Sequence, residues 1–488
     1  MKTIAFHNLG CKVNSYELDC MIQSAQSRGY SVVDFTQIAD IYVINTCTVT
    51  NIADRKSRQM LHRAKQKNPE ALVVAVGCYV QTDPAGVQAD PSVDLAIGNN
   101  HKGEYLDLIE EMLRDKRDLT AGDAACAATA QEGAQAEGAA PGLNAPARMV
   151  RQDGGELCSY EEMHLQRPSE HTRAYIKIQD GCNQFCTYCA IPYARGRVRS
   201  RGRDDILSEI RDVVKSGCRE IVLTGIHISS YGIDFDRDAW LSGEPVPTRK
   251  GPSGAGDYGG SSLLTDLLEC ISEVEGLERI RISSLEPRLI TEETARRMAA
   301  LPKLCPHFHL SLQSGCDDTL YRMNRKYTTA DFARSVEILR AAFDRPAITT
   351  DVIVGFPGET PEEFARTLDF LRQIAFYEIH VFKYSRRKGT VADRLPNQCT
   401  SEVKNQRSDI LLQLTEDQSK AFREKYVGQV ADVLWEEEVN IGGKPMTVGH
   451  TPDYVRIAVP AEEGLAGTVS RVAVTGFLES DLMAGTLE

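Results

Sequence analysis

The chain has 488 residues, of which 42% are hydrophobic, 7% aromatic and 26% charged. This composition excludes a wholly disordered chain, a collagen-like repeat and a coiled-coil rod, and the length predicts roughly two to four domains. The formal net charge of -13 argues against a protein that coats nucleic acid without specificity, so that any nucleic-acid contact must use a locally basic surface. No apolar stretch is long enough to span a bilayer and the first residues do not resemble a signal peptide, so we expect a cytoplasmic protein without a membrane partner.

The first part of the chain alternates short apolar runs with amphipathic stretches. The apolar runs predict buried strands at 3–9, 41–44, 72–76 and 95–97, and helical patterns lie between them at 15–28, 53–67 and 103–117. This alternation is typical of a parallel sheet covered by helices. Residues 120–147 then consist mostly of Ala, Gly, Gln and Glu, with too few large apolar side chains to fold, and predict a disordered linker.

A second α/β series follows the linker. Six apolar runs predict strands separated by helices, at 175–178, 221–224, 279–282, 308–312, 349–354 and 378–382. Six such units indicate an open or partial (β/α) barrel, with a Gly/Pro/Ser-rich loop inserted at 242–262. A charged helical stretch at 401–425 leads into short alternating runs that predict a small β-barrel. The expected fold class is therefore α/β, with a parallel βα domain, a partial barrel and a carboxyl-terminal β-barrel.

The sharpest motif lies directly after the first strand of the second series. Cys182, Cys186 and Cys189 stand there in CxxxCxxC spacing. Three thiolates on one tight loop can hold three irons of a cubane cluster and leave the fourth iron open to a small molecule. Active sites of such barrels lie at the carboxyl ends of the strands, where this loop is expected. The alternative is a structural zinc site, which needs a remote fourth ligand such as Cys158 or His171.

Three further cysteines are spread along the first domain. Cys11, Cys47 and Cys78 each follow the end of a predicted parallel strand. Ligand sites in open α/β sheets lie outside the carboxyl ends of the strands, so these three thiols should converge on one crevice. They could hold a second cluster there. One iron of that cluster would lack a protein ligand and could carry exogenous sulfur. Taken singly, each cysteine is more readily explained as a small buried residue than as a ligand. The other eight cysteines show no such arrangement, among them Cys20, Cys126, Cys218 and Cys399.

On these residues the sequence resembles the radical S-adenosylmethionine methylthiotransferases over nearly its whole length. That family joins a domain with three separated cysteines to a radical S-adenosylmethionine barrel with CxxxCxxC and to a TRAM-type RNA-binding barrel. The resemblance extends to the stretches 191–196, 283–287, 312–315 and 351–360. Residues 10–17, GCKVNSYE, and 45–50, NTCTVT, look most like the branch that acts on N6-threonylcarbamoyladenosine at position 37 of tRNA. The branches that modify N6-isopentenyladenosine of tRNA or an aspartate of ribosomal protein S12 look less similar.

The resemblance implies a domain plan, cofactors and partners. The plan is a three-cysteine domain at 1–119, a low-complexity linker at 120–167, a radical S-adenosylmethionine core at 168–400, and a linking helix with a TRAM-type domain at 401–488. The implied cofactors are two 4Fe-4S clusters and S-adenosyl-L-methionine. The CxxxCxxC cluster would bind S-adenosylmethionine, whose radical abstracts hydrogen from adenine C2, and the other cluster would supply sulfur. The implied partners are the anticodon arm of tRNA and an electron donor such as flavodoxin or ferredoxin.

Several polar residues are further candidates for contact with S-adenosylmethionine. They stand in the CxxxCxxC loop or near the carboxyl end of a predicted barrel strand, and comprise Tyr188, Thr224, Gly225, Ser283, Glu286, Gln313 and Asp351. Each could equally be a capping or supporting residue without contact to the cofactor.

An alternating run of arginines follows the CxxxCxxC loop, and is a candidate RNA-binding surface. It comprises Arg195, Arg197, Arg199, Arg201 and Arg203. If the stretch is extended, all five side chains lie on one side and can contact tRNA phosphates. The alternative is a solvated edge strand. A second basic stretch at 55–67 has helical spacing and is expected to be a solvated face.

A function of a different class is a non-catalytic, metal-containing RNA-binding protein. In that case the cysteine sites would be structural and the terminal barrel would bind RNA. Iron and acid-labile sulfide content separates the two hypotheses.

Overall fold

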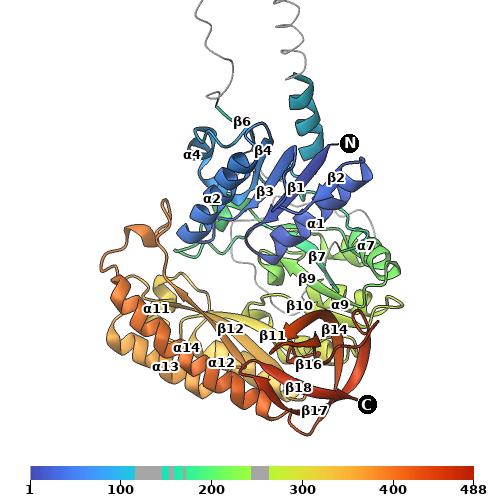
Figure 1. Ribbon diagram of the computed structural model, residues 1–488. Helices are drawn as coiled ribbons and strands as arrows, with labels where there is room; N and C mark the ends of the chain where they lie inside the picture. The colour runs from blue at the N-terminus through green and yellow to red at the C-terminus, as the bar shows by residue number, and fades with distance from the viewer. Residues whose placement is uncertain (1, 116–145, 153–158, 169–171, 243–262) are drawn as a thin grey trace, which may run out of the picture. The chain divides into compact units, whose positions relative to one another are not determined.

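The computed structural model describes residues 2–115, 146–152, 159–168, 172–242 and 263–488 (Figure 1). These residues form two compact units. Unit 1 takes in the described residues up to 152, together with Glu161–Met163 and Tyr193–Gly196. Unit 2 takes in most of the remainder and contains the CxxxCxxC loop. No helix among the described residues is long and apolar enough to cross a membrane.

Unit 1 is a parallel sheet with helices. Its elements are β1 (Thr3–Asn8), α1 (Lys12–Ser27), β2 (Ser31–Val33), β3 (Ile41–Thr46), α2 (Asn51–Lys67), β4 (Leu72–Gly77), α3 (Cys78–Thr82), α4 (Pro84–Gln88), β5 (Leu95–Ile97), a helix described over 105–115, and β6 (Arg148–Val150). The strand order is β2-β1-β3-β4-β5-β6, and every pair is parallel. The predicted parallel βα domain is therefore observed.

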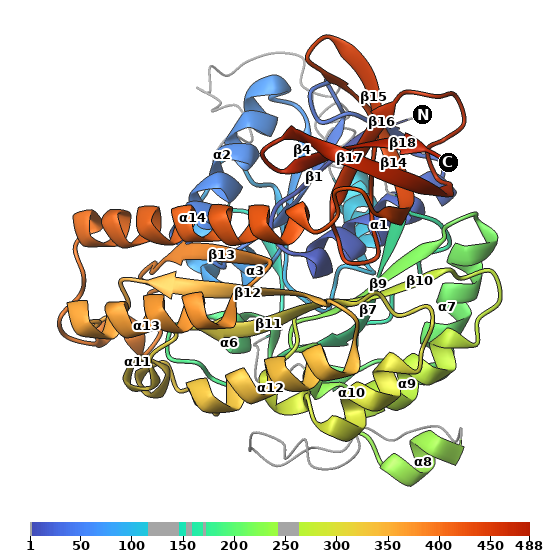
Figure 2. The same cartoon turned by 90° about the horizontal axis from the view of Figure 1, so that it is seen from below.

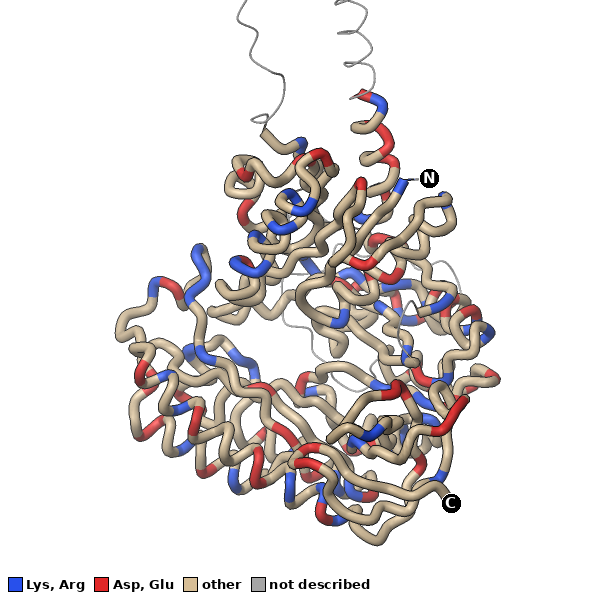
Figure 3. Tube along the Cα trace, in the orientation of Figure 1, with Lys and Arg blue, Asp and Glu red and all other residues tan. Residues whose placement is uncertain are grey.

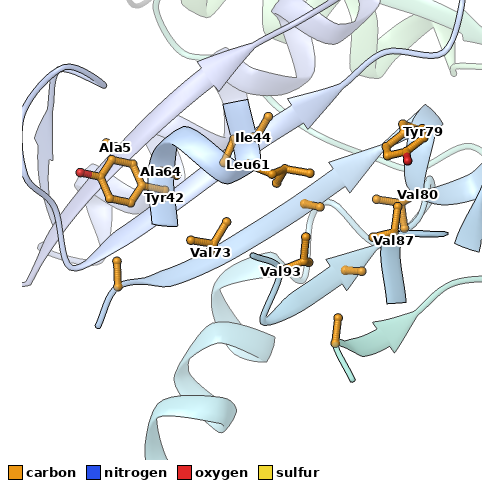
Figure 4. Close-up of a cluster of buried hydrophobic side chains, with 14 of the residues drawn as sticks. Ala5, Tyr42, Ile44, Leu61, Ala64, Val73, Tyr79, Val80, Val87 and Val93 are labelled. Carbon is orange, nitrogen blue, oxygen red and sulfur yellow. The ribbon is translucent and has the colours of Figure 1, made fainter. Parts of the chain in front are cut away.

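Burial explains why the central strands read as continuous apolar runs. Every residue of β3 and of β4 is buried, as expected for parallel strands covered on both faces. Figure 4 shows one of the resulting cores, where Tyr42 and Ile44 of β3 and Val73 of β4 pack with Leu61 of α2. The parallel register pairs Asn8 of β1 with Asn45 of β3, and Thr46 of β3 with Gly77 of β4, so the three strands end at the same edge of the sheet, just before the three separated cysteines.

Unit 2 contains two open sheets and a closed barrel. Its strands are β7 (Arg173–Asp180), β8 (Arg199–Ser200), β9 (Glu220–Gly225), β10 (Arg279–Ile282), β11 (His307–Gln313), β12 (Ala347–Val354), β13 (Glu378–Lys383), β14 (Val430–Ile441), β15 (Lys444–His450), β16 (Arg456–Pro460), β17 (Val469–Glu479) and β18 (Leu482–Leu487). Its helices are α7 (Arg203–Lys215), α8 (Arg237–Ser242), α9 (Leu263–Ser272), α10 (Glu292–Ala299), α11 (Asp317–Arg322), α12 (Thr329–Ala342), α13 (Pro361–Ile374) and α14 (Ser401–Glu424). The short α6 (Ile191–Arg195) begins in unit 2 and ends in unit 1.

The two open sheets make up the partial barrel. The strand orders are β10-β9-β7-β8 and β11-β12-β13, with all pairs parallel except β7 with β8. Isolated parallel bridges join Ile280 to Leu304 and Leu285 to Leu310, next to β10 and β11. Figure 2 shows α9, α10 and α12 alongside these strands. Figure 3 shows basic and acidic residues interspersed along α12, α13 and α14 rather than separated.

The closed barrel at the end of the chain has the order β14-β15-β16-β18-β17. Within unit 2 it packs on the partial barrel through Tyr454, whose ring lies 4.7 Å from the guanidinium carbon of Arg281 and 5.1 Å from that of Arg173. Arg281 is fully buried, and its Nη1 donates to the carbonyl of Pro452 at 2.9 Å. The carboxylate of Glu220 compensates the charge of Arg281 at 2.9 Å. The small carboxyl-terminal β-barrel is thus present, and the ring of Tyr454 and the carbonyl of Pro452 join it to buried arginines of the partial barrel.

The structure corrects the extent of the predicted linker. Residues 148–150 were assigned to it, but they form β6, which pairs with β5 and completes the sheet of unit 1. A three-residue strand beyond a long polar stretch carries no periodicity from which it could be recognised. The disordered segment predicted at 120–147 and the loop predicted at 242–262 lie almost entirely outside the described residues.

Candidate functional site

The three separated cysteines of unit 1 come together at one edge of its sheet. Cys11 caps α1 after β1, Cys47 follows β3, and Cys78 opens α3 after β4. The three thiols lie close enough for each of Cys11 and Cys47 to interact electrostatically with the other two. Cys11 is exposed, whereas Cys47 and Cys78 are buried. The site therefore offers three converging sulfur ligands with one accessible side.

Two glycines allow this close approach. Gly10 has φ +115°, and a Cβ there would lie 3.1 Å from the Sγ of Cys47. Gly77 has φ +97°, and a Cβ there would lie 2.8 Å from the side-chain oxygen of Asn45 and 3.1 Å from the carbonyl of Thr46. Both glycines directly precede a cysteine of the set, so the backbone turns that present Cys11 and Cys78 need residues without a Cβ.

Burial keeps the thiol of Cys47 protonated in the absence of a metal. It raises the pKa of Cys47 to about 11, with a smaller contribution from the neighbouring Cys78 and Cys11. Desolvation by the surrounding protein atoms also raises the pKa of Cys11, although its side chain is open to solvent on one side and the charge of Arg195 opposes the shift. Because metal ligation requires thiolates, loading of this site must release protons.

The CxxxCxxC loop of unit 2 follows β7. Gly181, directly before Cys182, has φ +72°, and Phe185, between Cys182 and Cys186, has φ +49°, so the backbone turns tightly at the start of the loop and within it. The segment after α11 anchors it, since the backbone N–H of Thr187 donates to the carbonyl of Met323 and the side chain of Asn324 donates to the carbonyl of Phe185. The thiols of Cys182, Cys186 and Cys189 interact electrostatically with one another.

An arginine donor lies against this loop. Nη1 of Arg325 donates to the Sγ of Cys186 at 3.2 Å, and Nε donates to the hydroxyl of Tyr327 at 2.8 Å. Arg325 has no recognisable signal in the sequence, because it belongs to no motif and its neighbours Asn324 and Lys326 are typical of an ordinary polar turn. Its position beside a cysteine sulfur is set by the anchoring contacts between the segment 323–324 and the loop.

Glu286 is the best defined of the polar candidates. It is buried after β10 and pairs with Nε2 of His227 at 3.0 Å and with Arg288 at 2.6 Å. Burial favours the neutral acid, but the hydrogen bond and charge of His227, with the charge of Arg288, outweigh it and lower the pKa of Glu286 to about 2. It also accepts from Nε2 of Gln184, in the cysteine loop, at 3.2 Å. Glu286 thus places a fixed negative charge beside the loop.

The remaining polar candidates occupy different environments. Ser283 follows β10 and its buried Oγ has no hydrogen-bond partner among the described residues. Thr224 and Gly225 end β9, and Gly225 packs so closely on Gln179 of β7 that a Cβ would lie 2.9 Å from its side-chain oxygen. Gln313 ends β11 after a bulge, with φ +73°.

Tyr188 and Asp351 are engaged by neighbouring side chains. The ring of Tyr188 lies 6.3 Å from that of Phe356, edge to face, and belongs to a hydrophobic cluster. Asp351 lies inside β12 rather than at its end, and pairs with Nε2 of His309 at 3.2 Å. Possible ligand atoms of His309, Asp351 and His380 lie within 4.8 Å of one another, a grouping that the sequence analysis missed because it depends on strand register.

The expectation of one extended stretch, with all five arginine side chains on one side, is wrong. Three of the five side chains are buried in ion pairs, Arg195 with Glu17, Arg199 with Asp180 and Arg201 with Glu209. The stretch is not one extended segment, because α6 ends at Arg195, β8 holds only Arg199–Ser200, and α7 begins at Arg203.

The other two arginines of the run differ from these three. Arg203 is partly buried, with its guanidinium carbon 5.2 Å from the ring of Trp240. Arg197 is exposed, with its guanidinium carbon 4.3 Å from the ring of Phe185 in the cysteine loop. Among the five arginines, Arg197 is therefore the one whose exposed side chain remains a candidate for contact with RNA.

Two family descriptions match the chain, and each match covers one of the two three-cysteine sets. Residues 176–371 match the Radical SAM superfamily, and residues 3–98 match the uncharacterized protein family UPF0004. The chain is 37% identical to the threonylcarbamoyladenosine tRNA methylthiotransferase MtaB of Bacillus subtilis, over 97% of this chain and 94% of that protein. It is 31% identical to the tRNA-2-methylthio-N(6)-dimethylallyladenosine synthase of Desulfitobacterium hafniense, over 95% and 93%.

The chain belongs to the radical S-adenosylmethionine tRNA methylthiotransferases. Among solved structures, the radical S-adenosylmethionine methyltransferase TsrM of Kitasatospora setae shares the fold, with a TM-score of 0.51, 14% identity, and 80% of this chain and 74% of that chain covered. The enzyme class excludes the alternative of a non-catalytic RNA-binding protein. The methylthiotransferase therefore uses S-adenosylmethionine and two 4Fe-4S clusters.

The donor sets of this methylthiotransferase fit the two clusters. Each unit brings three thiols together, and in each unit an arginine N–H donates to one of the sulfurs, Arg195 to Cys78 at 3.3 Å and Arg325 to Cys186 at 3.2 Å. Hydrogen bonds to the sulfurs are typical of thiolate-ligated clusters, which carry negative charge. The fourth ligands considered for a zinc site, Cys158 and His171, lie outside the described residues.

Proposed function

We propose that this methylthiotransferase transfers a methylthio group to C2 of N6-threonylcarbamoyladenosine at position 37 of tRNA, giving 2-methylthio-N6-threonylcarbamoyladenosine. The observation that carries the proposal is the presence of two three-thiol sites, one in each unit, in a chain whose relatives at 37% and 36% identity are named threonylcarbamoyladenosine tRNA methylthiotransferases. The phrases at 10–17 and 45–50 support the same branch.

The two cysteine sets have separate roles in this proposal. Cys182, Cys186 and Cys189 hold one cluster, and Cys11, Cys47 and Cys78 hold the other. When bound, the cluster on Cys182, Cys186 and Cys189 would supply the electron that cleaves S-adenosylmethionine to a hydrogen-abstracting radical. The cluster on Cys11, Cys47 and Cys78 would supply sulfur. Such a radical is needed because the C–H bond at adenine C2 is not activated for acid–base chemistry. The electron donor is a small redox protein such as flavodoxin or ferredoxin.

The protein's own residues orient the cofactor beside the loop. Glu286 is ionised at neutral pH, since its pKa is lowered to about 2, so it can accept a hydrogen bond from a hydroxyl or ammonium group of S-adenosylmethionine. Ser283 offers a buried hydroxyl whose hydrogen-bonding capacity is otherwise unused among the described residues. Thr224, Gly225, Gln313, Tyr188 and Asp351 are proposed as additional contacts.

The roles of the two sets are tested by two triple variants of the anaerobically reconstituted enzyme. Changing Cys182, Cys186 and Cys189 to Ala should abolish formation of 5'-deoxyadenosine. Changing Cys11, Cys47 and Cys78 to Ala should preserve 5'-deoxyadenosine but yield no methylthio product. Iron content should fall from about eight to about four per chain in both variants. Methylthiolated product from the second variant would refute its role as sulfur donor.

A second candidate substrate is N6-isopentenyladenosine of tRNA. It is favoured by the 31% identity to the dimethylallyladenosine synthase of Desulfitobacterium hafniense over 95% of the chain. The two candidate substrates require different side chains in the pocket that binds the N6 substituent of the adenine. A threonyl carboxylate calls for a polar or cationic partner, whereas an isopentenyl group calls for an apolar one.

A further inference from the structure

A buried group of charged side chains lies beside the three cysteines of unit 1. Glu17 of α1 accepts from Nη1 of Arg195 at 2.9 Å and from Nη2 at 3.0 Å, and it also pairs with Lys102. All three side chains are at most 1% exposed. Two cations and one anion leave an excess of one positive charge on these three buried side chains.

An excess of buried charge is costly unless a counter-charge compensates it. An uncompensated ion in a protein interior is strongly destabilising, because it has lost its hydration. The cysteine sulfurs would supply such a counter-charge once they ligate a cluster as thiolates, because Nε of Arg195 donates to the Sγ of Cys78 at 3.3 Å, and the charge of Arg195 also acts on Cys11 and Cys47. The excess positive charge therefore lies next to the three cysteine sulfurs that are proposed to ligate the cluster.

The orientation of Arg195 is fixed on every side. Nη2 also donates to the side-chain oxygen of Asn14 at 2.7 Å, so Nε and both terminal nitrogens have partners. Its backbone is held in unit 1 by Asn99, whose Nδ2 donates to the carbonyl of Ala194 at 2.8 Å. A planar guanidinium can reach Cys78, Glu17 and Asn14 together, which a lysine ammonium cannot do with the same geometry.

We propose that Arg195 and Lys102, joined by Glu17, form a cationic seat that sets the reduction potential of the cluster held by Cys11, Cys47 and Cys78. The inference rests on the proposed function, which assigns a cluster to these thiols. Reduction adds an electron to an already anionic group, so a nearby positive charge and an N–H···S hydrogen bond stabilise the reduced state more than the oxidised one. Arg195 and Lys102 are positioning residues that act through the cluster ligands.

The test uses the full chain with Cys182, Cys186 and Cys189 changed to Ala, so that only the cluster of unit 1 is loaded. Its reduction potential is measured by an anaerobic titration followed by electron paramagnetic resonance. In this background Arg195→Gln lowers the seat's charge by one, Glu17→Gln raises it by one, and the Arg195→Gln/Glu17→Gln double variant restores it.

The cationic seat predicts the order in which the reduction potentials of these variants should fall. Glu17→Gln should be the most positive, the parent and the double variant intermediate, and Arg195→Gln the most negative. We expect Arg195→Gln to change the reduction equilibrium at least tenfold relative to the parent, which is about 59 mV for one electron. A residue with a merely structural role would change cluster content without this order. Equal potentials, or the reverse order, at full iron content would overturn the proposal.

Two controls separate the alternatives. Arg28→Gln removes one positive charge at the opposite end of α1, where Arg28 pairs with Asp107 on the surface, and should leave the potential unchanged. If the Arg195→Gln variant does not retain iron, the Arg195→Lys variant is used to test whether the positive charge acts on the cluster. It should retain the cluster, with a potential slightly below the parent, and loss of iron from a folded lysine variant would contradict the role of charge. Absence of iron from the parent triple variant would refute the cluster assignment itself, and the seat with it.

Discussion

Arg325 donates a hydrogen bond from Nη1 to the Sγ of Cys186 at 3.2 Å. The sulfur belongs to the loop that follows β7, whereas the arginine follows α11, so the contact joins two segments of the partial barrel that are far apart in sequence. The same guanidinium donates to Tyr327 and to the carbonyl of Ser311, which fixes its plane. The cluster loop is thus oriented by a planar donor that lysine cannot replace.

Replacing Arg325 with Lys should slow the reductive cleavage of S-adenosylmethionine while the protein stays folded. The variant keeps the charge but loses the forked hydrogen bonds, so the cluster becomes harder to reduce, and we expect about a tenfold lower rate of 5'-deoxyadenosine formation, which corresponds to about 1.4 kcal/mol. The control is Arg322→Lys, three residues away, whose side chain pairs with Glu363 at 2.9 Å. Equal rates for the two variants would show that the contact with Cys186 has no effect.

Glu286 makes a pH-dependent contribution to stability. Its folded pKa of about 2 lies below the ordinary value of 4.5 for a glutamic acid, so the contribution is present above about pH 4.5 and is lost as the pH falls toward 2. We expect it to reach about 3 kcal/mol at pH 7 and to lose most of that by pH 3.

The measurement compares the thermal midpoints of wild-type and Glu286→Gln protein, both free of clusters, at pH 7 and at pH 3. The difference in thermal midpoint between the two proteins should be smaller at pH 3 than at pH 7. A gap of the same size at both values would contradict a carboxylate held ionised by His227 and Arg288.

Gly77→Ala should disrupt the three-cysteine site of unit 1 and leave the CxxxCxxC site intact. The added Cβ meets the side chain of Asn45 and the carbonyl of Thr46, and φ is +97° at this residue, so we expect strain of about 1 to 3 kcal/mol located next to Cys78. Iron should fall from about eight to about four per chain, with S-adenosylmethionine cleavage retained.

The matched control is Gly29→Ala. Gly29 has φ +81°, but a Cβ there meets nothing within 4 Å, so the substitution adds backbone strain without a clash. It should cost about 1 kcal/mol and leave the iron content unchanged. Equal iron loss in the two variants would mean that the close packing around Gly77 is not what shapes the cysteine site.

Arg197 should contribute to tRNA affinity through a phosphate contact. Removing one such contact with Arg197→Ala is expected to reduce the dependence of log affinity on log salt concentration by about one, and to weaken binding roughly threefold to tenfold. Fluorescence anisotropy with a labelled anticodon stem-loop, at several salt concentrations, measures both. Lys215→Ala removes an exposed charge from α7 and is the control. An unchanged salt slope in Arg197→Ala would exclude the contact.

The spacing of apolar runs was sufficient to predict the βα units and the closed barrel, because buried parallel strands leave a clear signal. The positions of Cys11, Cys47 and Cys78 at strand ends also predicted their convergence. The five arginines could not be placed in the same way. Their alternation suggested one extended edge, but the backbone passes from helix to strand to helix within that run, and Glu17, Asp180 and Glu209 bury three of the side chains.

Contacts that depend on tertiary packing had no sequence signal. Arg195 pairs with Glu17, 178 residues earlier, and Arg325 meets Cys186, 139 residues earlier. Such separations are set by which strands are neighbours and at what register, and neither is written in a local pattern. For the same reason β6 was hidden in the predicted linker.

The most direct test of the proposed function is nucleoside analysis of tRNA. The protein is expressed in a strain that lacks its own methylthiotransferases, and the tRNA is digested for mass spectrometry beside a control expressing the Cys11, Cys47 and Cys78 to Ala variant. We predict that 2-methylthio-N6-threonylcarbamoyladenosine accumulates with the wild-type chain and not with the variant. Methylthiolated isopentenyladenosine alone, or modified ribosomal protein S12 with unmodified tRNA, would contradict the account.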